Sequence, residues 1–323
     1  MKKFTKVSLI TAVVIMFLGI IIYVIGFLGG GQKDVNRMVE NGELTFFEDC
    51  ISAPEAPSAP EAPAAPEAPS KPAKSDVTAT SAVLEGSGEA ALTTEKVEKL
   101  VIEIGGGELY IESGDVSEIQ ITADCKEKFE SYIKDNTLYM KGFNLKKNFL
   151  QLDWGDWDGD RNVVHIVIPR ELVFEKADIS LGAGSIEITD ITLGDTDVEV
   201  GAGELKCTNT ISENLTTELG AGAVYMKNIK AGKSNITVAM GEAVLSGVFS
   251  GDMDLECSMG NLDVEIDGKE AEFNYAVEAA MGSVEVAGES YDGFASEKEV
   301  DNGADKTIHA EVSMGDIEIS FMK

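Results

Sequence analysis

Residues 179–188 read ISLGAGSIEI, and four later stretches repeat this pattern: VEVGAGELKC (198–207), TELGAGAVYM (217–226), ITVAMGEAVL (236–245) and LECSMGNLDV (255–264). The last glycine of each turn recurs every 19 residues, at Gly184, Gly203, Gly222, Gly241 and Gly260. A fixed period near 20 indicates one small supersecondary unit stacked on copies of itself, because a single copy cannot bury its apolar face alone. The sequence therefore predicts a repeat architecture.

Apolar residues alternate on both sides of each glycine, as in a strand with one buried face. In the first copy Ile179 and Leu181 precede the glycine, and Ile186 and Ile188 follow it. The alternation of apolar positions thus slips by one residue at the glycine. The slip predicts a corner between two short strands, and glycine would give that corner the backbone freedom it needs. Looser copies of the pattern occupy residues 102–111, 277–286 and 310–319.

The fold expected from this pattern is all-β: a single-stranded parallel β-solenoid with coils of about 19 residues, over residues 95–323. A right-handed wind is the default for parallel crossovers. Cys207 and Cys257 stand in apolar columns of the repeat, so we expect both in the core, whereas Cys50 and Cys125 are isolated.

The N-terminal part of the chain predicts a membrane anchor. A leader over residues 1–6 carries three lysines, and residues 7–28 form an uncharged apolar run that reaches the length of about 20 needed to span a bilayer. A cleaved signal peptide is the competing interpretation, but its apolar region would be about 7 to 15 residues. The lysines favour a cytoplasmic N-terminus. We therefore expect a single-pass protein of the cell membrane with most of the chain extracellular.

Two further segments separate this run from the repeats, a juxtamembrane segment at 29–52 and a Pro/Ala/Glu-rich linker at 53–75. Proline recurs every third residue from Pro54 to Pro72. Such spacing favours an extended polyproline rod. A spacer is the favoured interpretation over a ligand for an SH3-type domain.

The charge of the chain excludes some partners. There are 57 acidic and 26 basic residues, which gives a formal net charge of -31. Nucleic acid and anionic lipid headgroups both require basic surfaces, so no nucleic-acid partner is expected.

Little in the sequence points to catalysis. The chain has two histidines, no His-Glu-x-x-His pattern and no Cys-x-x-Cys pattern, so we predict no enzyme, no catalytic residue and no cofactor. One acidic loop is a candidate calcium site, through the carboxylates of Asp153, Asp156, Asp158 and Asp160. It lacks the EF-hand spacing, and a turn between strands is the favoured interpretation. Within this loop, Trp154 and Trp157 are candidates for stacking on a sugar ring or anchoring a protein.

Three stretches carry a resemblance to a known group: HIVIP (165–169), ADISLGAG (177–184) and SMGDIEISF (313–321). Over residues 95–323 the chain resembles the bacterial putative-adhesin family, a β-solenoid domain of unknown function often tethered by one N-terminal helix. The resemblance implies the fold but no catalytic residues.

The predicted function is a binding, adhesion or scaffolding module at the cell envelope, with a cell-wall glycan or an envelope protein as partner. A regulatory membrane protein that senses envelope stress is the alternative, and a carbohydrate-active enzyme is the less favoured third hypothesis. Outward positions vary from one repeat to the next. We therefore expect recognition in the irregular segments 125–162 and 288–306.

Overall fold

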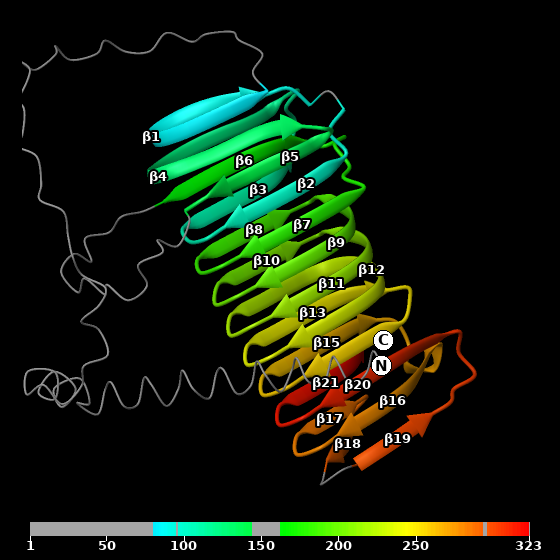
Figure 1. The fold of residues 1–323 in the computed structure, drawn as a ribbon. Coiled ribbons are helices and arrows are strands. Elements are labelled where there is room, and N and C mark those ends of the chain that lie inside the picture. Colours follow the sequence, from blue (N-terminus) through cyan, green and yellow to red (C-terminus); the bar gives the residue numbers. More distant parts are fainter. Residues whose placement is uncertain (1–79, 95, 144–161, 293–295, 323) are drawn as a thin grey trace, which may run out of the picture. The chain divides into compact units, whose positions relative to one another are not determined.

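Each 19-residue repeat folds into one coil, in which two strands meet at the glycine corner and the next coil stacks in register (Figure 1). In the first of these coils Lys176–Leu181 (β7) leads into Ser185–Thr189 (β8), and in the next Thr192–Val200 (β9) leads into Glu204–Thr208 (β10). β7 runs parallel to β9 and β8 runs parallel to β10, each shifted by one repeat. The two short strands predicted around each corner are thus confirmed.

The computed structural model describes residues 80–94, 96–143, 162–292 and 296–322, all of which lie in one unit, Lys74–Lys323. Within these residues the only helix is a single 3-10 turn, Glu270–Glu272 (η1). The other strands are, in chain order, Ser81–Leu92 (β1), Lys99–Ile104 (β2), Glu108–Gly114 (β3), Ile119–Lys134 (β4), Thr137–Gly142 (β5), Val163–Pro169 (β6), Ile211–Leu219 (β11), Ala223–Val238 (β12), Glu242–Phe249 (β13), Met253–Cys257 (β14), Asn261–Asp267 (β15), Phe273–Ala279 (β16), Ser283–Val286 (β17), Glu289–Asp292 (β18), Ser296–Val300 (β19), Lys306–Val312 (β20) and Asp316–Met322 (β21).

The strands form two parallel ladders. The first ladder holds the strands before the corners, in the order β5, β2, β7, β9, β11, the second half of β12, β14, β20 and β16. The second ladder holds those after the corners, in the order β6, β3, β8, β10, the first half of β12, β13, β15, β21 and β17. The long strands β4 and β12 pair into both ladders. Eleven strands, from β4 through the first ladder to β12 and back through the second ladder to β4, therefore form a closed sheet.

These pairings correct the predicted fold class. The described residues are all-β, but the prediction of a single-stranded, all-parallel β-solenoid is wrong, because the sheet is closed and its strand directions are mixed. β4 is antiparallel to β1, β5 and β6, while β18 and β19 are antiparallel to β17 and β16. Alternation of apolar residues is the same in parallel and antiparallel strands, so the sequence pattern did not reveal these directions. The handedness of the coils stays a prediction.

Stacking order differs from chain order at both ends of the unit. The coil β20–β21 comes last in the sequence, yet it lies between the coils β14–β15 and β16–β17 (Figure 1). Similarly, β2–β3 lies between β5–β6 and β7–β8. The coil formed by the final strands is therefore an internal layer of the stack.

The predicted transmembrane helix, and the single-pass localisation that depends on it, also need correction. In the described part of the chain, no helix is long and apolar enough to cross a membrane. The run 7–28 itself lies outside the described residues, as do the leader 1–6, the segment 29–52 and the linker 53–75. Membrane attachment therefore rests on composition alone.

Close stacking of the corners explains most of the repeated glycines. A Cβ atom on Gly222 would lie 2.1 Å from the carbonyl oxygen of Gly203, and one on Gly260 would lie 2.2 Å from that of Gly241. Only Gly184 among the five has a positive φ, at +134°. The expectation that backbone freedom requires these glycines is therefore right for Gly184 and wrong for the other four, where contact with the preceding coil excludes a side chain.

Three coils share a second corner, which lies after the strand that follows the glycine and depends on different residues. Asp190, Asn209 and Asn228 take left-handed φ values of 59°, 55° and 54°. Asp and Asn tolerate this conformation better than other residues that carry a side chain. The Asn209 amide donates to the Asp190 carboxylate at 2.7 Å, and the Asn228 amide donates to the Asn209 side-chain oxygen at 2.6 Å. These side chains form a hydrogen-bonded row that links three coils.

The interior is filled by the apolar columns that the repeat predicted. Ile179, Leu181, Ile186 and Ile188 of the first coil are at most 2% exposed, as are their counterparts Val198, Val200 and Leu205 in the next. Cys207 and Cys257 lie in these columns and are buried free thiols, which confirms their predicted place in the core.

The Cys207 thiol should make stability depend on pH. Burial raises the pKa of Cys207 from 9.0 to about 12. Above pH 9 the unfolded chain loses this proton while the folded chain keeps it, so stability falls as the pH rises. Between about pH 8 and about pH 10 we expect the free energy of unfolding to fall by about 1.4 kcal/mol more in the parent than in Cys207→Val, measured by urea unfolding. Equal losses in both proteins would contradict this role of the thiol.

Candidate acidic groove on the first ladder

Outward side chains of the first ladder stand in rows, because neighbouring strands pair in register. One row runs through Glu103, Ser180, Glu199, Glu218, Thr237, Glu256, Glu311 and Glu278. A second row runs beside it through Val101, Asp178, Asp197, Thr216, Asn235, Asp254, His309 and Ala276. Strand pairing places neighbours in a row about 4.8 Å apart. The face therefore presents carboxylates at a fixed spacing.

A shallow groove of about 430 Å³ crosses this face over β2, β7, β9 and β11. Five carboxylates line it, from Glu103, Asp178, Asp197, Glu199 and Glu218. The strands that carry them are held by the ladder and by the buried columns beneath. The groove is thus an acidic surface on a preorganised support.

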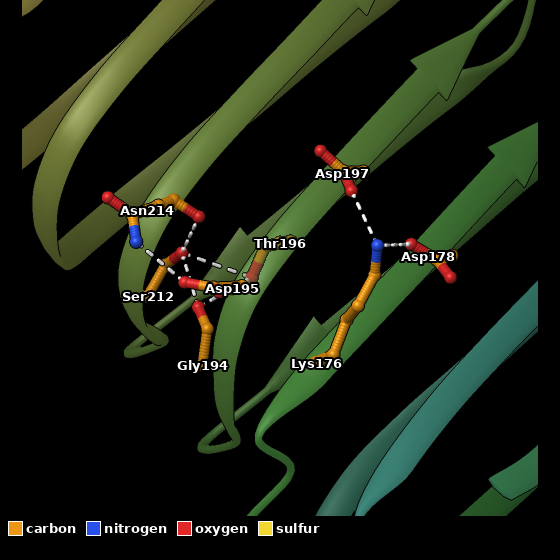
Figure 2. A network of polar contacts seen from close by, with 8 residues as sticks. All are labelled: Lys176, Asp178, Gly194, Asp195, Thr196, Asp197, Ser212 and Asn214. Carbon is orange, nitrogen blue, oxygen red and sulfur yellow. Dashed lines mark hydrogen bonds and ion pairs between the residues drawn. The ribbon is translucent and has the colours of Figure 1, made fainter.

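Lysines neutralise part of the groove. The Lys176 ammonium lies 3.0 Å from carboxylate oxygens of both Asp178 and Asp197 (Figure 2). The hydrogen bond to Asp178 contributes most to raising the pKa of Lys176, and the hydrogen bond to Asp197 raises it further. At another edge Lys141 contacts Glu103 at 2.8 Å. Such exposed pairs contribute about 0 to 1 kcal/mol each to stability, so they shape the local charge more than they hold the fold.

Glu199 and Glu218 remain without a counter-charge. They occupy adjacent strands in register, and both side chains are exposed. Among the described residues neither carboxylate makes a hydrogen bond or an ion pair. Two like charges at this spacing repel each other, and a cationic group placed between them would relieve that repulsion.

A polar network fixes the end of the groove where β9 and β11 begin. The Asn214 amide donates to Asp195 at 2.6 Å (Figure 2). The Ser212 hydroxyl lies 2.9 Å from the carbonyl oxygen of Gly194 and 3.0 Å from the hydroxyl of Thr196. These contacts lock β9 against β11 where the two strands begin, in the same strands that carry Glu199 and Glu218 further along. The register between coils creates the two rows of outward side chains. Comparing outward residues along the sequence alone shows only that they vary, so it does not reveal these rows.

The residues predicted from the acidic loop lie elsewhere in the chain. Asp153, Trp154, Asp156, Trp157, Asp158 and Asp160 fall in residues 144–161, outside the described residues, so the calcium and sugar-stacking hypotheses stay predictions. In the residues that are described, no group of three or more His, Cys, Asp or Glu side chains is arranged to hold a metal ion. The described parts of segments 125–162 and 288–306 include β5, which is parallel to β2 but antiparallel to β4, and the antiparallel strands β18 and β19 at the other end of the stack.

The two-strand coil with its glycine corner is matched by a known family. The family model described as Toastrack DUF4097 matches residues 97–290, more than half of the chain. The chain belongs to this family. The match confirms the resemblance to the putative-adhesin group seen in the sequence. No curated protein matches the chain.

Solved structures similar to this Toastrack chain carry related descriptions. A putative cell adhesion protein from Clostridium sporogenes has 14% identity and a TM-score of 0.32, with 73% of this chain and 99% of that chain covered. A putative adhesin from Bacteroides fragilis has 12% identity and a TM-score of 0.36, with 74% and 97% covered. A putative lipid binding protein from Parabacteroides distasonis has 12% identity and a TM-score of 0.35, with 74% and 97% covered. At these TM-scores none of the likenesses identifies a ligand or an activity.

Proposed function

We propose that the chain is an adhesion-like binding module without catalytic activity, which holds a macromolecular partner on the outer face of its first ladder. The observation that carries this proposal is the unpaired Glu199 and Glu218 in the acidic groove. A surface of this kind binds cationic groups, so the partner is a protein that presents lysine or arginine side chains. An envelope protein fits this chemistry better than a neutral cell-wall glycan.

The shape of the described surface supports recognition by contact rather than by enclosure. The groove is open, and a cavity in the apolar interior beside it, near Leu193, Cys207 and Met226, has a volume of about 10 Å³. A partner would therefore meet side chains that strand pairing already holds in place. Such preorganisation lowers the entropy that binding costs.

Binding should depend strongly on salt. The full chain is expected to co-sediment with a protein-containing envelope fraction of its source bacterium and to bind purified cell-wall glycan more weakly. Bound protein should fall by about tenfold or more when the salt concentration rises from about 0.05 M to about 0.5 M, because solvent ions screen exposed charges. Measuring bound and free protein across this series tests the expectation. Binding that does not change with salt would contradict an acidic recognition face, and preference for the glycan fraction would contradict a basic protein partner.

A further inference from the structure

Four methionines line up along the glycine corners of four neighbouring coils, at Met240, Met259, Met314 and Met281. Each occupies the residue before the corner glycine. Backbone bonds join the corners: the Met259 amide donates to Ala239 at 2.8 Å, the Met314 amide to Ser258 at 2.7 Å and the Met281 amide to Ser313 at 2.8 Å. The reversed stacking order brings Met314 between Met259 and Met281. We call these four residues the methionine row.

The fold itself does not need methionine at this position. The three preceding coils carry Ala183, Ala202 and Ala221 there, with the same hydrogen bonds between corners. Met281 is 62% exposed and Met314 is 49% exposed, and the other two are partly exposed. Four long apolar side chains thus stand on the surface where a methyl group is enough for the corner.

The spacing of the row suits metal coordination by sulfur. Coils stack about 4.8 Å apart. Two sulfur ligands on one metal ion lie up to about 4.6 Å apart, which is twice a metal–sulfur bond of about 2.3 Å. Methionine has three rotatable bonds beyond its backbone, so neighbouring thioethers can close the remaining difference. Adjacent members of the row can therefore share one ion.

The chemistry of the row selects the class of ion. Thioethers are soft, neutral ligands that favour Cu(I) over hard divalent cations. The formal charge of -31 draws cations toward the molecule and repels anions. Neutral ligands inside a negative field match a monovalent soft cation.

We propose that the methionine row binds a soft monovalent cation, Cu(I) or its heavier analogue Ag(I), between neighbouring thioethers. The proposal is independent of the acidic groove, because the row lies at the corners and the groove on the face of the first ladder. At least two adjacent methionines are needed for each ion, and the central pair, Met259 and Met314, has a further member of the row on each side.

Titration of the full chain with silver nitrate in chloride-free buffer, followed by calorimetry, tests this site. A Cys50→Ser background removes the one cysteine outside the described residues, while the other three are buried. We expect Met259→Leu/Met314→Leu to weaken silver binding by about tenfold or more, because leucine keeps the apolar bulk and removes the sulfur. Met322→Leu is the matched control, since Met322 is 38% exposed but lies outside the row.

A second double variant, Met259→Ala/Met314→Ala, restores the residue that other coils carry and should show the same loss of silver binding with an unchanged circular dichroism spectrum. Silver binding by the leucine double variant with the parent's affinity would overturn the proposal. So would the absence of silver binding by the parent.

Discussion

Removal of residues 306–323 is expected to unfold the whole described unit rather than to shorten it by one coil. These residues form β20 and β21, which separate the coil β14–β15 from the coil β16–β17. The deletion takes away four fully buried branched side chains: Ile308, Val312, Ile317 and Ile319. At about 1.5 to 3 kcal/mol each they contribute roughly 6 to 12 kcal/mol, which matches the whole stability of a typical domain, about 5 to 15 kcal/mol.

Circular dichroism and limited proteolysis of the truncated chain measure this effect. The matched control removes only residues 322–323, which takes away one strand pair, Met322 with Asp267, but leaves the buried residues of β21 in place and should keep the parent's spectrum. The opposite result is a 306–323 deletion that leaves a cooperatively folded protein whose circular dichroism signal falls only by the share of one coil. That result would contradict the internal position of β20–β21.

Gly222→Ala is expected to lower the free energy of unfolding by about 3 kcal/mol. The added Cβ would meet the carbonyl oxygen of Gly203 at 2.1 Å, a distance that real Cβ atoms do not reach. The clashing atom belongs to the backbone of a neighbouring coil, so the two coils must move apart to make room. Their corner hydrogen bond, from the Ala221 amide to Gly201 at 2.7 Å, would be strained at the same time.

Gly268→Ala gives the control for this substitution. Its added Cβ would lie 3.5 Å from the Glu272 side chain and 3.6 Å from the Ile266 side chain, which is ordinary contact. We expect a change within about 0.5 kcal/mol, as for most surface substitutions. Urea unfolding of both variants measures the difference, and equal midpoints would show that close stacking does not explain the glycine ladder.

Much of the coil could be predicted from the sequence, because its signals are local. Alternating apolar residues fix which side chains face inward, and the 19-residue period fixes how copies align. The second corner was missed although Asp190, Asn209 and Asn228 also recur every 19 residues. Their signal is a polar residue with a left-handed backbone, which apolar periodicity does not report.

The direction and order of the strands were beyond the repeat pattern. The antiparallel strands β1, β4, β18 and β19 carry no copy of the glycine corner, and their partners are set by long-range pairing. The place of β20–β21 inside the stack likewise depends on which strands these two pair with, β14 and β15 on one side and β16 and β17 on the other. Local alternation of apolar residues contains no such information.

The acidic groove was missed for a related reason. Outward residues vary along the chain, so they seemed unsuited to a shared site. Coil register instead joins Glu199 to Glu218 on one side and leaves Lys176 to neutralise Asp178 and Asp197 on the other. Both facts can be seen only when the three-dimensional neighbours of each carboxylate are known.

The most direct test of the proposed function compares two pairs of glutamates in one binding assay. Glu199→Gln/Glu218→Gln removes the unpaired groove charges, whereas Glu285→Gln/Glu318→Gln removes two charges from neighbouring strands of the second ladder. Both variants change the net charge equally, so the long-range field cancels in the comparison. The affinity of the full chain for the envelope protein fraction is predicted to fall by about tenfold in the groove variant and by less than about twofold in the control. Equal losses in the two variants, or no loss in the groove variant, would contradict the assignment of the groove as the recognition surface.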